Sequence, residues 1–374
     1  MKRNGYIIWL GSVINEAAML SMRGVSLAAN LFQRSLISAL CLNGINVRII
    51  GHIPESLWPR GRFLLKSTPE MLSPNIKGDL VSYLNVPFLR EKDIGRRYLK
   101  SLRGFCEKFG KPTAVFSYNT STPIRVIGEY AQRKLGIPWV CIMADGEEPE
   151  GADGLVFLSW GKYSKSVQKT RLHLDGGVPG FHGPVDRQAK PKNSFKQTVM
   201  FAGSMGLHAG VDFLVNAFRR ISNKNAELLI CGKGKNRYVE DAAYLDPRIK
   251  VLGAVTEERL DELFRLADIF VNSNRSTFPN NRNNFPSKVL EYLSYGKPVI
   301  STWTEGLSPE YRKILTVLEN ETPECLARAI ENVLQWDAAQ FIEFRKRAAD
   351  FMESKIWDAQ AKRLIEWFKS EVNL

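Results

Sequence analysis

The chain has 374 residues, 44% of them hydrophobic, and a formal net charge of +13 from 52 basic and 39 acidic residues. This length is too great for one ordinary hydrophobic core and predicts two domains, while no apolar run approaches the ~18 residues that would span a bilayer. The positive charge favours an anionic partner, which can be a nucleotide, a phospholipid surface or a nucleic acid.

The N-terminal sequence and the cysteine and histidine patterns narrow the class further. The start, MKRNGYIIWLGS, has a short apolar run typical of a first strand and not of a signal peptide. The five cysteines show no C-x-x-C spacing, which favours reduced thiols in a cytoplasmic protein. The four histidines are dispersed, so no metal site is expected.

The first half of the chain alternates predicted strands and helices. A strand at 6–10 is followed by a small-residue loop at 11–24, a helix at 25–43 and a strand at 46–50. The glycines of the loop at 11–24 do not form the pattern G-x-G-x-x-G, so the fingerprint of a dinucleotide-binding site is absent. Residues 54–88 are irregular and predict loops. Strands follow at 114–117, 138–143 and 154–159, with a helix at 124–135 between the first two.

The segment Arg90–Lys111 predicts a basic amphipathic helix. One helical stripe is apolar, from Ile94 to Phe109, and another carries Arg96, Lys100 and Arg103. Such a helix can lie against an anionic membrane, although a charged stripe of this kind more often faces solvent.

Polar residues follow two of the predicted strands. Tyr118 and Asn119 come directly after the strand at 114–117, and Asp145 follows the strand at 138–143. Ligands of open α/β sheets bind where strands deliver their carboxyl ends. These three residues are therefore candidates to bind an acceptor substrate. The acidic run at 145–148 is not completed by a second cluster of metal ligands, so surface carboxylates are the simpler interpretation.

The polar segment 185–196 lacks periodicity and predicts a linker between domains at 1–184 and 197–352. The second half then repeats the alternation, with strands at 198–202, 227–231, 249–252 and 268–272 and helices at 211–222 and 257–267. Strands alternating with helices on both sides of a linker predict an α/β protein of two doubly wound parallel sheets that face a central cleft.

The stretch from Asn283 to Gly306, NNFPSKVLEYLSYGKPVISTWTEG, predicts a loop, a helix at 287–295 and a strand. Unpaired amides around Ser287 and Lys288 would attract an anion, and the lysine adds a positive charge for a phosphate. Glu291 lies at i+3 from Lys288 on the same face, where its carboxylate can accept both hydroxyls of a ribose. The pattern indicates a nucleotide site, although an ordinary capped surface helix has the same features.

Several motifs together resemble the retaining GT-B glycosyltransferases of family 4, the "group 1" glycosyltransferases. They are FAGSMGLHAGVDFLVNAF, ICGKGKN, LGAVTEERLDELFRLADIFVN and PSKVLEYLSYGKPVIS, all between about residues 197 and 306. WDAQAKRLIEWF resembles the family's closing helix, so residues 353–374 are expected to cross back to the N-terminal domain. The first half resembles the family in its βαβ layout and in SLAANLFQRSLISALCLNGINVRII.

The resemblance implies transfer of a sugar from a nucleoside diphosphate sugar to a hydroxyl of a glycan or lipid-linked acceptor, with retention and without a metal or resident cofactor. UDP or GDP is the favoured nucleotide. Lys288 would neutralise the leaving diphosphate and Glu291 would hold the ribose. The remaining contacts implied for the nucleotide sugar come from both domains: Gly11, Ser12, Gly203, Ser204, Gly232, Val255 and Ser287.

The chain also departs from the family pattern. Asn283 stands where the usual E-x7-E has its first glutamate, and Ser204 and Ala209 replace a basic pair, for which Lys288 with Arg275 or Arg282 can compensate. These changes leave open a non-catalytic GT-B subunit or chaperone of an active glycosyltransferase. A nucleic-acid-binding protein is not expected, because no basic face with interleaved aromatics is present.

Overall fold

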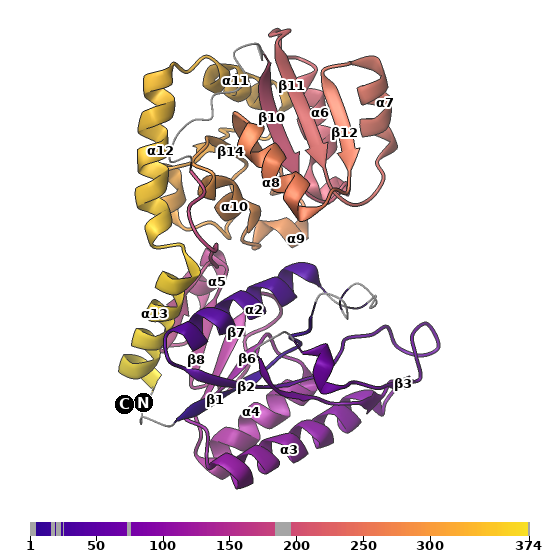
Figure 1. Ribbon diagram of the computed structural model, residues 1–374, viewed down its shortest axis with the longest axis vertical. Helices are drawn as coiled ribbons and strands as arrows, with labels where there is room; N and C mark the ends of the chain where they lie inside the picture. The colour runs from indigo at the N-terminus through magenta and orange to yellow at the C-terminus, as the bar shows by residue number, and fades with distance from the viewer. Residues whose placement is uncertain are drawn as a thin grey trace. The chain divides into compact units, whose positions relative to one another are not determined.

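A computed structural model describes residues 5–15, 19, 24, 26–72, 76–183 and 196–372. The chain divides into two compact α/β units (Figure 1). Unit 1 consists of residues 1–158, 163–177 and 357–374, and unit 2 of residues 159–162 and 178–356. Residues 178–183 therefore pack with unit 2. The predicted linker lies outside the described residues except for its last position, so the boundaries at 184/185 and 196/197 stay predictions.

Unit 1 is built on a parallel sheet of seven strands in the order β4-β2-β1-β6-β7-β8-β9. Because β2 and β6 lie on opposite sides of β1, the strand order reverses at β1. A separate antiparallel pair joins β3 to β5. The elements are β1 (Tyr6–Leu10), α2 (Leu27–Leu42), β2 (Asn46–Gly51), β3 (Leu64–Leu65), β4 (Lys77–Leu80), β5 (Tyr83–Leu84), α3 (Arg90–Phe109), β6 (Ala114–Tyr118), α4 (Thr122–Leu135), β7 (Trp139–Met143), β8 (Gly154–Phe157), β9 (Arg171–His173) and α13 (Trp357–Trp367), with α5 (Trp160–Lys165) crossing between units.

Local sequence explains where the first elements begin and end. All five residues of β1 are buried, as expected for a strand covered on both faces. The Ser26 hydroxyl accepts a hydrogen bond from the Ala29 amide and starts α2. Gly136, with φ +64, ends α4 in the left-handed conformation.

The C-terminal helix α13 packs within unit 1 against α2. The rings of Phe32 and Trp357 meet edge to face at 5.3 Å, and the Asn43 side-chain amide donates to the Asp358 carboxylate at 2.8 Å. Residues far apart in the chain therefore share one core.

Unit 2 is built on a parallel sheet of six strands in the order β12-β11-β10-β13-β14-β15. Here the strand order reverses at β10, because β11 and β13 flank it. The elements are β10 (Gln197–Ala202), α6 (Val211–Phe218), β11 (Ala226–Cys231), α7 (Arg237–Leu245), β12 (Ile249–Gly253), α8 (Glu257–Leu266), β13 (Ile269–Asn272), α9 (Pro279–Arg282), α10 (Lys288–Ser294), β14 (Val299–Ser301), β15 (Thr316–Val317), α11 (Pro323–Leu334) and α12 (Ala338–Glu353).

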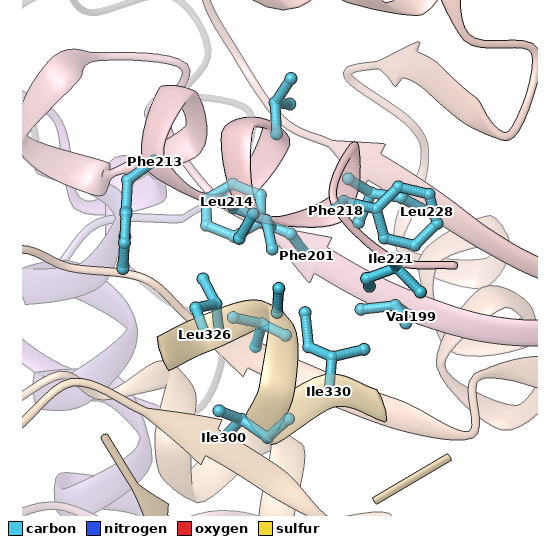
Figure 2. Close-up of a cluster of buried hydrophobic side chains, with 14 of the residues drawn as sticks. Val199, Phe201, Phe213, Leu214, Phe218, Ile221, Leu228, Ile300, Leu326 and Ile330 are labelled. Atoms are coloured by element: carbon cyan, nitrogen blue, oxygen red, sulfur yellow. The ribbon is translucent and has the colours of Figure 1, made fainter. Parts of the chain in front are cut away.

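Strand β10 shows how this sheet is covered on both faces. Val199 and Phe201 belong to one buried cluster, while Met200 and Ala202 belong to another. This alternation follows from the two-residue repeat of a strand. In the first cluster, side chains of α6 and α11 pack together on the sheet (Figure 2). The core fixes β10, and with it the loop that follows the strand.

Candidate functional site

The reversal of strand order in unit 2 marks the place where a ligand is expected. In open parallel sheets, ligands bind beyond the carboxyl ends of the strands at such a reversal. β10 ends at Ala202 and β13 ends at Asn272. The loops that begin at Gly203 and Ser273 therefore lie side by side at this point, because β10 and β13 pair directly.

The Gly203 loop is held in place by Gly232. A Cβ on Gly232, whose φ is +152, would lie 1.5 Å from the Gly203 carbonyl oxygen, so only glycine is compatible with this approach. The Gly203 amide donates to the Cys231 carbonyl at 2.9 Å, and the Gly232 amide donates to the Gly253 carbonyl at 2.8 Å. Gly232, one of the residues implied to contact the nucleotide sugar, supports the backbone of the Gly203 loop in the structure.

Helix α10 begins at Lys288, one residue later than predicted, and has seven residues. Its first turn is closed by hydrogen bonds from the Val289 amide to the Pro286 carbonyl (2.9 Å) and from the Leu290 amide to the Ser287 carbonyl (3.1 Å). The macrodipole of so short a helix is small, so the lysine supplies most of the positive charge here.

The Lys288 side chain extends over the Gly203 backbone. A Cβ on Gly203 would lie 3.7 Å from Lys288 Cε. The Lys288 ammonium lies 3.7 Å from a carboxylate oxygen of Glu291, as the i, i+3 spacing predicts, and both side chains are partly exposed. An exposed pair at this distance is weak, so the ammonium can exchange the carboxylate for an anionic ligand.

A pocket of about 250 Å³ opens among these segments of unit 2. Four residues predicted from the sequence line it: Gly203, Ser204, Ser287 and Lys288. The other polar lining residues, which the sequence analysis missed, are His208, Asn272, Asn274, Asn281, Asn284 and Thr304.

The asparagines of this pocket have two roles. The buried Asn281 amide donates to the His208 carbonyl at 2.6 Å and to the Arg275 carbonyl at 2.9 Å, which fixes two loops. Within the described ranges, the side chains of Asn274 and Asn284 make no hydrogen bond to the protein, so their amides can bind a ligand. The many asparagines between residues 272 and 284 were the feature of the sequence from which these lining residues could have been predicted.

Besides Gly232, three residues of unit 2 predicted for this site do not line the pocket. Asn283 ends the short helix α9 and is half-buried, beside two asparagines that do line the pocket. Glu291 lies one turn along α10. Val255 packs against a hydrophobic cluster of unit 2 instead.

The two arginines considered as compensating charges have other contacts. The Arg282 guanidinium pairs with Glu305 at 2.8 Å. The Arg275 guanidinium lies 5.7 Å from the centre of the Phe213 ring. Neither lines the pocket, which leaves Lys288 as its lining cation of fixed charge.

Unit 1 has an equivalent edge, where β1 and β6 end side by side at the reversal of its sheet. Gly11 and Ser12 follow β1. A Cβ on Gly11 would lie 2.1 Å from the Gln33 side-chain oxygen, and the Ser12 hydroxyl donates to the His52 carbonyl at 2.7 Å. The turn therefore lies close to α2 at Gln33 and is bonded to the residue that follows β2.

The three predicted acceptor residues meet at the same edge of unit 1. Asn119 has a left-handed backbone (φ +55), and its side-chain oxygen accepts hydrogen bonds from the Ala144 amide (2.8 Å) and the Asp145 amide (2.9 Å). Burial, with the Asp145 charge as a smaller cause, raises the pKa of Tyr118. Asp145 is exposed. Asn119 therefore ties the ends of β6 and β7 together.

Among the described residues, no group of three or more histidine, cysteine, aspartate or glutamate side chains is arranged to hold a metal ion. No helix in the described part of the chain is both long and apolar enough to cross a membrane.

Comparison with known proteins agrees with this architecture. Residues 196–335 match the family described as "Glycosyl transferases group 1". No curated protein sequence matches the chain.

Solved structures of similar fold cover almost the whole chain. Sucrose-phosphate synthase from Thermosynechococcus elongatus is 17% identical, with a TM-score of 0.67 over 97% of this chain and 98% of that one. HepE from Anabaena, in complex with UDP, is 14% identical, with a TM-score of 0.68 over 98% of this chain and 100% of that one. The lipopolysaccharide outer core galactosyltransferase WaaB in its apo form is 14% identical, with a TM-score of 0.65 over 98% of this chain and 99% of that one.

These similarities concern the fold, since every identity is low. The chain has the GT-B fold of two Rossmann-like units, and its segment 196–335 is similar to the group 1 glycosyl transferases.

Proposed function

We propose that this chain is a glycosyltransferase that moves a sugar from a nucleoside diphosphate sugar to a hydroxyl acceptor. The observation that carries the proposal is the pocket at the strand reversal of unit 2, where the Lys288 side chain crosses the Gly203 backbone. Glycine lets a diphosphate approach the main chain, and the ammonium stabilises the charge that develops on the leaving group. The match of residues 196–335 to group 1 glycosyl transferases supports this assignment.

The finer features of the reaction belong to the same proposal. Transfer proceeds with retention and without a metal, and the leaving phosphate takes the acceptor proton, so no protein base is required. Glu291 holds the ribose, and UDP or GDP is the nucleotide. Structures of HepE with UDP and with UDP-glucose support a uridine nucleotide. The acceptor, a glycan or a lipid-linked sugar, binds near Tyr118 and Asp145, and the basic face of α3 contacts an anionic membrane.

The test is release of nucleoside diphosphate from a panel of UDP- and GDP-sugars by the purified chain. We expect turnover with at least one donor, unchanged by EDTA and lost in Lys288→Ala. Lys224→Ala, which removes an exposed lysine outside the pocket, should retain activity. Absence of turnover with every donor would count against catalysis, and inhibition by EDTA would overturn metal independence. The anomeric configuration of the product, read by NMR, decides between retention and inversion.

One observation favours a second candidate, a non-catalytic subunit of an active glycosyltransferase. Asn283 cannot stabilise positive charge as the glutamate of E-x7-E can, and the residue lies outside the pocket lining. A subunit of this kind would bind a nucleotide sugar without releasing diphosphate, and Asn283→Glu would not create turnover.

A further inference from the structure

Unit 1 carries a group of exposed apolar side chains, here called the apolar tip: Leu57, Trp58, Phe63, Phe88 and Leu89. Phe88 is 95% exposed, Phe63 55% and Trp58 47%. Trp58 and Phe63 meet edge to face at 6.2 Å. In the sequence these residues precede β3 or follow β5, the two strands of the antiparallel pair, and β3 lies at the margin of the unit (Figure 1). Large apolar side chains gathered on a surface mark interaction sites, whereas single ones do not.

Hydrogen bonds of one buried residue hold the part of the apolar tip that carries Trp58 and Phe63. Asn85 has no exposed surface, and its side-chain amide donates to the Ser56 carbonyl at 2.7 Å and to the Arg62 carbonyl at 2.8 Å. Its backbone donates to the Phe63 carbonyl at 2.7 Å and accepts from the Trp58 amide at 3.1 Å. The aromatic rings are thus presented by an anchored segment.

Phe88 adds a conformational observation. Its φ is +64, in the left-handed region that bulky residues avoid. A conformation that costs of order 1 kcal/mol persists only where the surrounding structure enforces it, and such positions concentrate at functional sites. In this chain the strained residue is also the most exposed phenylalanine of the described part.

The surroundings of the tip are basic. Residues 54–66 and 85–97 contain seven basic and three acidic side chains, a net charge of +4. Lys66, Lys92 and Arg96 are exposed. The apolar stripe of α3, by contrast, is buried in the core of unit 1 at Ile94, Tyr98 and Leu102, so these side chains are not available to insert into a membrane.

We propose that the apolar tip docks unit 1 on an anionic lipid bilayer. The tryptophan and phenylalanine rings enter the interface, where aromatic side chains are favoured, and the basic side chains contact lipid phosphates. A second copy of the chain fits this surface poorly, because a two-fold dimer would place the same net positive charge against itself. The inference goes beyond sugar transfer and uses no residue of the unit 2 pocket.

The test is co-sedimentation of the full chain with phosphatidylcholine vesicles that contain or lack phosphatidylglycerol. We expect binding to the anionic vesicles that weakens with salt, and much less to the neutral ones. The double variant Phe63→Ser/Phe88→Asn should lower the partition coefficient at least about ten-fold, since burial of one large apolar side chain is worth that much. Phe88→Asn alone relieves the left-handed strain, so it should fold and still bind less.

Tyr244→Ser/Leu245→Ser is the matched control, because it removes exposed apolar surface (Tyr244 is 90% exposed) from unit 2. We expect this variant to bind vesicles as the parent does. Equal binding by the tip variants and the parent, or no binding to anionic vesicles at all, would overturn the proposal. So would concentration-dependent self-association that the tip variants abolish in the absence of lipid.

Discussion

The carbonyl oxygen of Gly203 lies where a side chain on Gly232 would have to be, 1.5 Å from the ideal Cβ position. Since φ of Gly232 is also +152, an alanine there is both strained and in collision with backbone. We predict that Gly232→Ala lowers the free energy of unfolding by at least about 2 kcal/mol and weakens nucleotide binding, because the Gly203 loop must move. Urea unfolding and calorimetric titration measure the two effects.

Gly104→Ala is the matched control. Gly104 lies inside α3, and a Cβ there meets nothing within 4 Å. We expect this alanine to stabilise the protein by about 0.5–1 kcal/mol and to leave nucleotide affinity unchanged. If both alanines had the same effect, the close approach of Gly232 to Gly203 would not be a structural requirement.

A second prediction concerns the ribose. Glu291 lies 3.7 Å from the Lys288 ammonium on the same face of α10. If its carboxylate holds the ribose hydroxyls, the parent should bind a ribonucleoside diphosphate about ten-fold or more tightly than the 2′,3′-dideoxy analogue. Glu291→Ala should bind both equally. A preference that survives in the variant would show that another residue holds the ribose.

Asn119 combines a left-handed backbone with two accepted hydrogen bonds, from the amides of Ala144 and Asp145. We predict that Asn119→Ala destabilises the chain by about 2 kcal/mol, through lost hydrogen bonds and backbone strain. Asn119→Asp should recover most of this, because a carboxylate accepts the same hydrogen bonds and aspartate tolerates this conformation. The midpoint of urea unfolding measures both effects. If Asn119→Asp were as unstable as Asn119→Ala, the hydrogen bonds that Asn119 accepts would not be what stabilises this turn.

His52 predicts a pH dependence of stability. It follows β2, with its Nδ1 2.6 Å from the Tyr98 hydroxyl. Burial, and to a lesser extent the charge of Arg90, lowers the pKa of His52 from 6.5 to about 4. Between these values the unfolded chain binds a proton that the folded chain does not. The stability contributed by neutral His52 is therefore fully present above pH 6.5 and lost as pH falls toward 4.

The measurement compares unfolding free energies at about pH 7.5 and about pH 5, where the loss assigned to His52 should be about 2 kcal/mol. Other groups titrate in this range, so the comparison is made between the parent and His52→Gln. Between the two pH values, His52→Gln should lose about 2 kcal/mol less unfolding free energy than the parent. An identical loss in both proteins would contradict the assignment.

The sequence predicted most of the fold where apolar runs and helix stops were strong. β1, β2, β6 and β7 agree with the predicted strands within about one residue, because each contains several buried apolar residues in succession or alternation. β4 was missed in the region expected to be irregular. Its sequence KGDL contains a glycine and lies half-exposed at the sheet edge, so it has no apolar periodicity.

The residues of the candidate site were predicted in part. Gly203, Ser204, Ser287 and Lys288 were found from local motifs, and the structure brings them into one pocket. The pocket asparagines, which all lie between the end of β13 and the start of α10, were missed because only the pairing of β10 with β13 brings this segment beside the Gly203 loop.

Isothermal titration of the chain with UDP, GDP, dTDP and ADP measures whether the unit 2 pocket binds a nucleoside diphosphate through Lys288. We predict saturable binding of at least one of them, weakened about ten-fold or more in Lys288→Ala and unchanged in Lys224→Ala. Binding that is equally strong in Lys288→Ala and the parent, or no binding of any of the four, would show that Lys288 does not hold a nucleoside diphosphate in this pocket.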